Sequence, residues 1–147
     1  MKIVYLMVLL SQVFLWSACS ESADPATQND TLYNRLGGLP AIEAVVDTFA
    51  AEVLATPRLA VFFENADLTR FRILLTEMIC EAAEGPCSYS GRSMSTIHHG
   101  MGIASADFEA LVGALRTTLE RFRVPLREQN ELIRIMGLQQ ESIVENP

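Results

Sequence analysis

The two histidines of the chain, His98 and His99, are adjacent and lie within residues 89–103. They end a stretch that predicts one or two helical turns, and the Gly100-x-Gly102 pattern after them is typical of a helix end. An imidazole in such a place is suited to bind a transition metal or a haem iron from one fixed direction. A histidine that only packs in a core or faces solvent is the more common case, so the rest of the chain must distinguish the two.

Length and charge set limits on the class of protein. The chain has 147 residues, enough for one domain with its own core, and a formal net charge of −7. Removing residues 1–18 takes away one lysine and no acid, which makes the charge −8. Binding to phosphates needs clustered lysine and arginine, so we expect no nucleic-acid partner. The sequence has neither a glycine-rich phosphate loop nor the Cys/His spacing of a zinc site.

Residues 1–18 have the pattern of a secretory signal, with Lys2 near the start, a mostly apolar middle and the small residues Ser17 and Ala18 at the end. The apolar part is too short and too interrupted for a membrane span. Cys19 follows directly, as in the lipobox of a bacterial lipoprotein. We therefore predict cleavage before Cys19 and a lipid anchor on this residue that attaches the protein to a bacterial membrane, facing the periplasm. The alternative is an ordinary secreted protein.

After the signal, residues 19–30 are mostly small and polar and predict a tether, which leaves residues 31–147 as the folded domain. Cys80 and Cys87 lie in this domain. In an oxidising compartment they would be able to form a disulfide that closes a small loop. In the other interpretation, Cys80 is a buried apolar residue and Cys87 a free thiol. The sequence leaves both open.

Four stretches carry apolar residues at helical spacing, and no stretch of useful length alternates as a strand does. The predicted helices span residues 41–55, 68–83, 105–122 and 126–143. We expect Asp67 and Ser105 to be the N-cap residues of the second and third helices. The segment Leu32 to Leu36 predicts at most a short helix. The predicted fold class is therefore all-α.

Four patterns occur in a fixed order along the chain. They are Leu32-Tyr33-x-Arg35-Leu36-Gly37-Gly38, Ala41-Ile42-x-x-Val45-Val46-Asp47-x-Phe49, Pro57-Arg58-Leu59-x-x-Phe62-Phe63, and Tyr89-x-Gly91-Arg92-x-Met94 followed by Ile97-His98-x-Gly100-x-Gly102-Ile103. Together they resemble a group I truncated haemoglobin over about residues 31–145. The resemblance implies a two-over-two helical sandwich around haem b, in which the first two predicted helices cross the last two.

The resemblance also implies a haem ligand. By position, His98 matches the family's proximal ligand to the iron, and it would be neutral, with its other ring nitrogen donating to a backbone carbonyl. His99 would point about 100° away on a helical turn, so we expect it on the solvent side or beside a haem propionate. Phe63 matches the aromatic residue that packs against the haem, and Phe49 and Phe62 would line the same pocket.

Other positions follow from the same resemblance. Arg70 and Arg92 would either pair with the haem propionates or be solvated surface residues. Gly100 and Gly102 would free the backbone beside the haem. Glu84 stands where relatives often have a glycine.

The distal side departs from the family pattern. Many members place a tyrosine and a glutamine where this chain has Ala50 and Leu75, and these donate hydrogen bonds to bound oxygen. The gate position holds Phe71, and Met78 lies one turn beyond Leu75. The implied distal pocket, which also includes Phe49, is therefore apolar. Losing such a bond removes roughly 1.5–3 kcal/mol, or about 10–100-fold in an equilibrium constant. We expect faster oxygen release and weak discrimination against CO.

The leading hypothesis is reversible binding and carriage of dioxygen, or of CO or NO, outside the cytoplasm. An enzymatic alternative is nitric oxide dioxygenation or a peroxidase-like activity. Both would need an external reductase, because the chain shows no flavin motif, and a peroxidase would also benefit from a distal acid–base group. A third alternative is a gas-sensing or haem-carrying module that acts through a partner.

Overall fold

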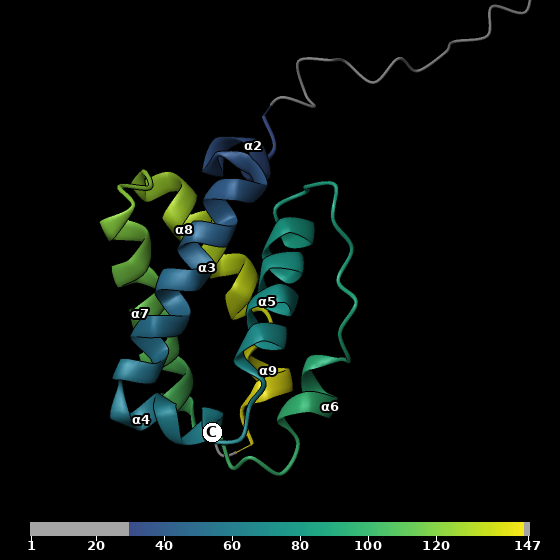
Figure 1. Ribbon diagram of the computed structural model, residues 1–147, viewed down its shortest axis with the longest axis vertical. Helices are drawn as coiled ribbons and strands as arrows, with labels where there is room; N and C mark the ends of the chain where they lie inside the picture. The colour runs from purple at the N-terminus through teal and green to yellow at the C-terminus, as the bar shows by residue number, and fades with distance from the viewer. Residues whose placement is uncertain (1–29, 146–147) are drawn as a thin grey trace, which may run out of the picture.

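The computed structural model describes residues 30–145. The predicted signal peptide, the predicted lipidation site Cys19 and most of the predicted tether lie outside these residues. Within them the structure is helical and has no strand, which confirms the predicted all-α class. The elements are α2 (Leu32–Leu36), α3 (Gly38–Ala55), α4 (Pro57–Ala60), the 3-10 turn η1 (Val61–Phe63), α5 (Leu68–Ala82), α6 (Met94–His98), α7 (Ser105–Arg121), α8 (Leu126–Gly137) and α9 (Gln140–Ile143) (Figure 1).

Helix α3 is the centre of the arrangement. It packs against α5 on one side and α7 on the other, and α7 packs against α8 (Figure 1). The pairs α3/α5 and α7/α8 form the predicted two-over-two sandwich. The short α6 stands apart from these layers and contacts α9. Among the residues described, no helix is both long enough and apolar enough to cross a membrane.

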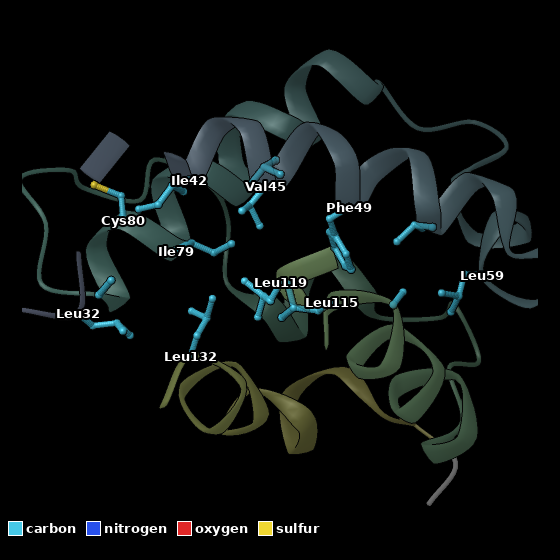
Figure 2. Packing of buried hydrophobic residues seen from close by; sticks show 14 residues of the cluster. Leu32, Ile42, Val45, Phe49, Leu59, Ile79, Cys80, Leu115, Leu119 and Leu132 are labelled. Atoms are coloured by element: carbon cyan, nitrogen blue, oxygen red, sulfur yellow. The ribbon is translucent and has the colours of Figure 1, made fainter. Parts of the chain in front are cut away.

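The apolar faces predicted from helical spacing meet between the layers (Figure 2). Val46 and Val53 of α3 belong to the same buried cluster as Leu119 of α7 and Leu132 of α8, and each of the four is at most 1% exposed. Because such sites cannot collapse around a deletion, truncating either leucine to alanine would cost about 2–5 kcal/mol. The core therefore fixes where the layers cross.

The start of α3 lies earlier than predicted, at Gly38 instead of residue 41. Gly37 precedes it with φ 100°, a left-handed conformation that a glycine adopts without strain. Pro40 lies inside the first turn, where its missing N–H is not needed for the helix. The Tyr33 hydroxyl accepts the N–H of Leu39 at 3.0 Å and so supplies part of the missing cap.

Of the two predicted N-caps, one is confirmed and one is wrong. The Oδ1 atom of Asp67 accepts the N–H of Arg70 at 3.0 Å, as an N-cap does. Ser105, however, is already the first residue of α7, and the N-cap position is Ala104. The carboxylate of Asp107 accepts the N–H of Ala104 at 2.9 Å instead. This bond satisfies the N–H of the N-cap residue, whereas an N-cap serine would have accepted an N–H from the first turn of the helix.

The predicted last helix, residues 126–143, is two helices with a turn between them. After Gly137, a poor helix former, the N–H groups of Leu138 and Gln139 bond three residues back and not four. Leu138, an apolar residue within the predicted helix, is 70% exposed. The break turns α9 away from the axis of α8 and brings it against α6.

Cys80 and Cys87 form a disulfide with a Cα–Cα distance of 5.7 Å. Cys80 is fully buried near the end of α5, and Cys87 belongs to the loop that leads to α6. Between them, the N–H of Gly85 donates to the carbonyl oxygen of Cys80 at 2.8 Å. Of the two interpretations of these cysteines, the structure therefore has the disulfide, which links the start of the loop to α5.

Candidate functional site

A cavity of about 330 Å³ lies between the helical layers and α6. Most of its wall is apolar, and it is lined from α3, α4, η1, α5, α6, α7, α8 and α9 and from the loops between them. This volume falls in the range of small-molecule and cofactor sites. The cavity is therefore large enough to be a binding site and is too large to be a packing defect.

Seven of the ten predicted site residues line this cavity. They are Phe49, Phe62, Phe63, Phe71, Leu75, Met78 and His98. They come from four elements separated in the sequence, namely α3, η1, α5 and α6, so only the fold brings them together. The remaining three are Ala50, Arg70 and Arg92.

Ala50 is one of the three predicted site residues that are not found in the cavity lining. Its side chain is 2% exposed, yet it does not line the cavity, while its neighbour Phe49 does. Successive helical residues point about 100° apart, and a methyl group is too short to reach round the helix. The position is buried core and forms no part of the cavity wall.

The His98 ring is held in a defined orientation. Its Nδ1 lies 2.8 Å from the carbonyl oxygen of Met94, one turn earlier in α6. A carbonyl oxygen only accepts, so Nδ1 carries the proton and Nε2 of the neutral ring keeps its lone pair. Ser93 caps the start of the helix by accepting the N–H of Thr96. The arrangement leaves one nitrogen of a cavity-lining imidazole available as a ligand.

His99 takes the other direction. Its side chain is 89% exposed, and Nδ1 lies 3.6 Å from the Glu145 carboxylate. The histidine pair therefore divides as the helical offset predicts, with one ring at the cavity and the other in solvent.

The wall that α3 and α5 contribute contains no polar side chain. Its members are Phe49, Phe71, Leu74, Leu75, Met78 and Ile79. The ring of Phe71 meets that of Phe63 edge-on, with a centroid distance of 4.9 Å. Such aromatic pairs are worth about 0.5–1.5 kcal/mol beyond their buried area, so this part of the wall is stiff as well as apolar.

Besides His98, three polar residues line the cavity, namely Tyr89, Asp107 and Gln139. The Tyr89 hydroxyl donates to the carbonyl oxygen of Arg92 at 2.9 Å. Asp107 accepts from Ala104 and, at 2.6 Å, from Arg58, and these bonds hold its pKa below the usual value. Gln139 follows α8, next to the helix that contacts α6. None of the three belongs to the α3/α5 wall.

Arg70 and Arg92 are exposed and do not line the cavity. Both arginines interact electrostatically with Tyr89, and Tyr89 does line the cavity. Burial raises the pKa of the Tyr89 hydroxyl and the charge of Glu77 raises it further, while the two arginines lower it. The arginines therefore lie within electrostatic reach of the cavity edge formed by Tyr89.

Part of the cavity lining was not predicted from the sequence. All four methionines of the described chain, Met78, Met94, Met101 and Met136, reach the cavity, and only Met78 was assigned to it. Met94 precedes His98 by one turn, so helical spacing would have placed it on the same face. No local pattern marks Met101 or Met136. Flexible thioether side chains suit an irregular cavity because they adapt their shape to its contents.

This set of residues fits a haem. A porphyrin needs an apolar enclosure, an axial ligand and a charged edge, and the cavity offers an apolar lining, the free Nε2 of His98 and two nearby arginines. Within residues 30–145, no group of three or more His, Cys, Asp or Glu side chains is placed to hold a bare metal ion. A single histidine suits an iron that a macrocycle already holds.

Comparison with known proteins agrees with this assignment. The bacterial-like globin family model matches residues 31–144. The group 1 truncated hemoglobin GlbN of Mycolicibacterium paratuberculosis is 33% identical over 111 residues, which cover 76% of this chain and 79% of the relative. The group 1 truncated hemoglobin of Tetrahymena pyriformis is 32% identical over 106 residues, covering 72% and 88%.

Solved structures give the same result. The truncated hemoglobin of Tetrahymena pyriformis in the Fe(III) form superposes with a TM-score of 0.75 at 30% identity, covering 78% of this chain and 97% of that one. The 2/2 hemoglobin of Synechococcus sp. PCC 7002, with covalently attached heme, has a TM-score of 0.74 at 27% identity, covering 79% and 99%. This chain therefore belongs to the bacterial-like globin family and is a group 1 truncated globin.

Proposed function

We propose that this chain binds haem b through His98 and reversibly binds dioxygen, or another diatomic gas, on the side of the α3/α5 wall. The observation that carries the proposal is the hydrogen bond from His98 to Met94, which leaves Nε2 of a cavity-lining imidazole free. Haem, when bound, would supply the iron that binds the gas.

The residues of the chain would divide the remaining tasks. Phe63 and Phe71 would enclose the ring system, and the apolar cavity would exclude water from it. Arg70 and Arg92, near the edge at Tyr89, are suited to pair with the propionates, since a guanidinium matches a carboxylate.

The α3/α5 wall determines how the gas is held. Because it contains no donor, a polarised ligand such as dioxygen gains no hydrogen bond from it, while CO loses little. Oxygen would leave about 10–100-fold faster than from a relative with one good donor, the equivalent of roughly 1.5–3 kcal/mol.

The same wall favours carriage over catalysis. A peroxidase needs a group that moves a proton to the departing oxygen, and neither α3 nor α5 places one at the cavity. Nitric oxide dioxygenation would need an external reductase to return the iron to the ferrous state.

We further propose that the protein works outside the cytoplasm, anchored to a bacterial membrane through a lipid on Cys19. The Cys80–Cys87 disulfide supports this location, because disulfides persist in oxidising compartments.

The test is the absorption spectrum of the purified protein with haem in ferric, ferrous and CO forms, recorded beside His98→Ala and His99→Ala. We expect a five-coordinate ferrous spectrum that His98→Ala abolishes and the exposed His99→Ala keeps. A chain that forms no stable haem complex, or a His98→Ala spectrum identical to the wild type, would overturn the proposal.

A further inference from the structure

Glu145 holds the loop that follows His98 at three points. Its backbone N–H donates to the carbonyl oxygen of Ile103 at 2.9 Å. Its carboxylate accepts the N–H of Gly100 on Oε1 at 2.5 Å and the N–H of Gly102 on Oε2 at 2.7 Å. One residue near the C-terminus thus engages both sides of a turn more than forty residues earlier in the chain.

The loop is shaped to receive an anion. Gly100 and Gly102 have φ values of 79° and 67°, which L side chains rarely adopt. A Cβ atom on either residue would meet nothing within 4 Å, so glycine is needed here for the backbone conformation and not for space. Two backbone N–H groups that converge in this way form a concavity for negative charge, and Glu145 fills it. These bonds in turn lower the pKa of the Glu145 carboxyl, because they favour its charged form.

The helix that carries His98 depends on outside contacts. Helix α6 has only five residues, and a helix of this length is not stable by itself in water. At its N-terminal side it has the Ser93 cap. At its C-terminal side the chain enters the loop that Glu145 holds, and α9, just before Glu145, packs against α6. The family model ends at residue 144, so the carboxylate lies one residue beyond the matched segment.

We infer that Glu145 is a positioning residue for the haem ligand: by filling the concavity of Gly100 and Gly102 it fixes the loop after α6 and keeps His98 at the cavity. This inference rests on the proposed ligation of haem by His98. Charge-assisted hydrogen bonds are roughly twice as strong as neutral ones, so the carboxylate cannot be replaced by an amide without loss. An amide at residue 145 would also turn an N–H donor toward one of the two N–H groups.

The experiment compares full-length wild type with Glu145→Gln, and with Glu141→Gln as the matched control, because Glu141 is an exposed acid on α9. With haem bound, the measurements are the rate of haem loss to an excess of an apoglobin acceptor and the iron–histidine stretching frequency by resonance Raman. Without haem, the measurement is amide hydrogen exchange at Gly100 and Gly102.

We expect Glu145→Gln to lose haem about tenfold faster, the effect of about 1.4 kcal/mol, with a shifted iron–histidine frequency and faster exchange at both glycines. Glu141→Gln should match the wild type in all three. Unchanged haem loss and frequency in Glu145→Gln, in a wild type that binds haem, would overturn the positioning role and leave the proposed function intact. A wild type that binds no haem would overturn the proposed function, and unchanged amide exchange would then separately overturn the loop contact.

Discussion

Nδ1 of His98 and the carbonyl oxygen of Met94 lie 2.8 Å apart across one turn of α6. The bond does two things at once: it sets the tautomer of the ring and it limits rotation about the side-chain bonds. A neutral imidazole so held has one direction left in which it can bind. Everything proposed for the cavity depends on that direction.

The first prediction tests whether the imidazole of His98 is the iron ligand, by removing this side chain and supplying imidazole from solution. In His98→Gly the five-coordinate ferrous haem spectrum should be lost, and free imidazole added to the solution should restore it, because the space left by the side chain opens on the cavity. Absorption spectra along an imidazole titration check this. His99→Gly serves as the control and should need no imidazole. Failure of imidazole to restore the spectrum would mean that residue 98 does not face the iron.

The second prediction concerns the missing donor. Leu75→Gln places an amide on the α3/α5 wall with little change in volume, and it should slow oxygen release about tenfold or more. Leu75→Met, equally apolar and similar in size, should leave the rate near that of the wild type. Stopped-flow dissociation measures both. Equal rates in the two variants would show that residue 75 does not reach the gas.

The features that were predicted correctly are those marked by a local pattern of residues. Helical spacing located the main helices, and the motif around His98 identified a ring that does line the cavity. Of the two predicted N-caps only Asp67 was right, because the exact residue at which a helix begins depends on the folded backbone, and α7 begins at Ser105 with Ala104 as its N-cap.

The features that could not be predicted depend on contacts between residues far apart in the sequence or on how whole helices are placed. Cys80 and Cys87 pair because α5 and the following loop bring them to 5.7 Å, and no spacing rule decides this. Glu145 meets Gly100 and Gly102 only because the chain breaks after α8 and α9 turns back onto α6. The exclusion of Ala50 from the cavity depends on how α3 is rotated, which neighbouring helices fix together.

The disulfide gives the third prediction. Replacing Cys80 and Cys87 together by alanine should lower the free energy of unfolding by about 2–3 kcal/mol, since the bridge closes a short loop in the unfolded chain. Urea denaturation of the variant and of the wild type, each with and without reductant, measures this. Reductant should destabilise the wild type by a similar amount and leave the variant unchanged. A wild type insensitive to reductant would contradict the bridge.

The fourth prediction is a dependence on acid. The N–H of Ala104 and the guanidinium of Arg58 hold the pKa of Asp107 below its ordinary 3.8 in the folded chain. A carboxyl with a lowered folded pKa stabilises the fold above its unfolded pKa, and this contribution is lost as pH falls through the folded value. Unfolding free energy measured from neutral pH downward should therefore drop less steeply in Asp107→Asn. Glu109→Gln, exposed on the same helix, is the control, and a slope equal to that of the wild type in Asp107→Asn would refute the prediction.

The last prediction concerns Glu84, which follows α5 with φ 62°. A side chain in this left-handed conformation is strained, because its Cβ crowds the following carbonyl, and glycine removes the strain. Glu84→Gly should therefore raise the free energy of unfolding by about 0.5–1 kcal/mol, an unusual sign for a change to glycine. The control is Glu81→Gly, three residues earlier and inside α5, which should lower it by about 1 kcal/mol, because there the same residue weakens a helix. Urea denaturation of both variants measures the two changes in the free energy of unfolding, which should have opposite signs. If both variants are destabilised, the backbone at residue 84 does not have the left-handed conformation that gives the loop its path toward α6.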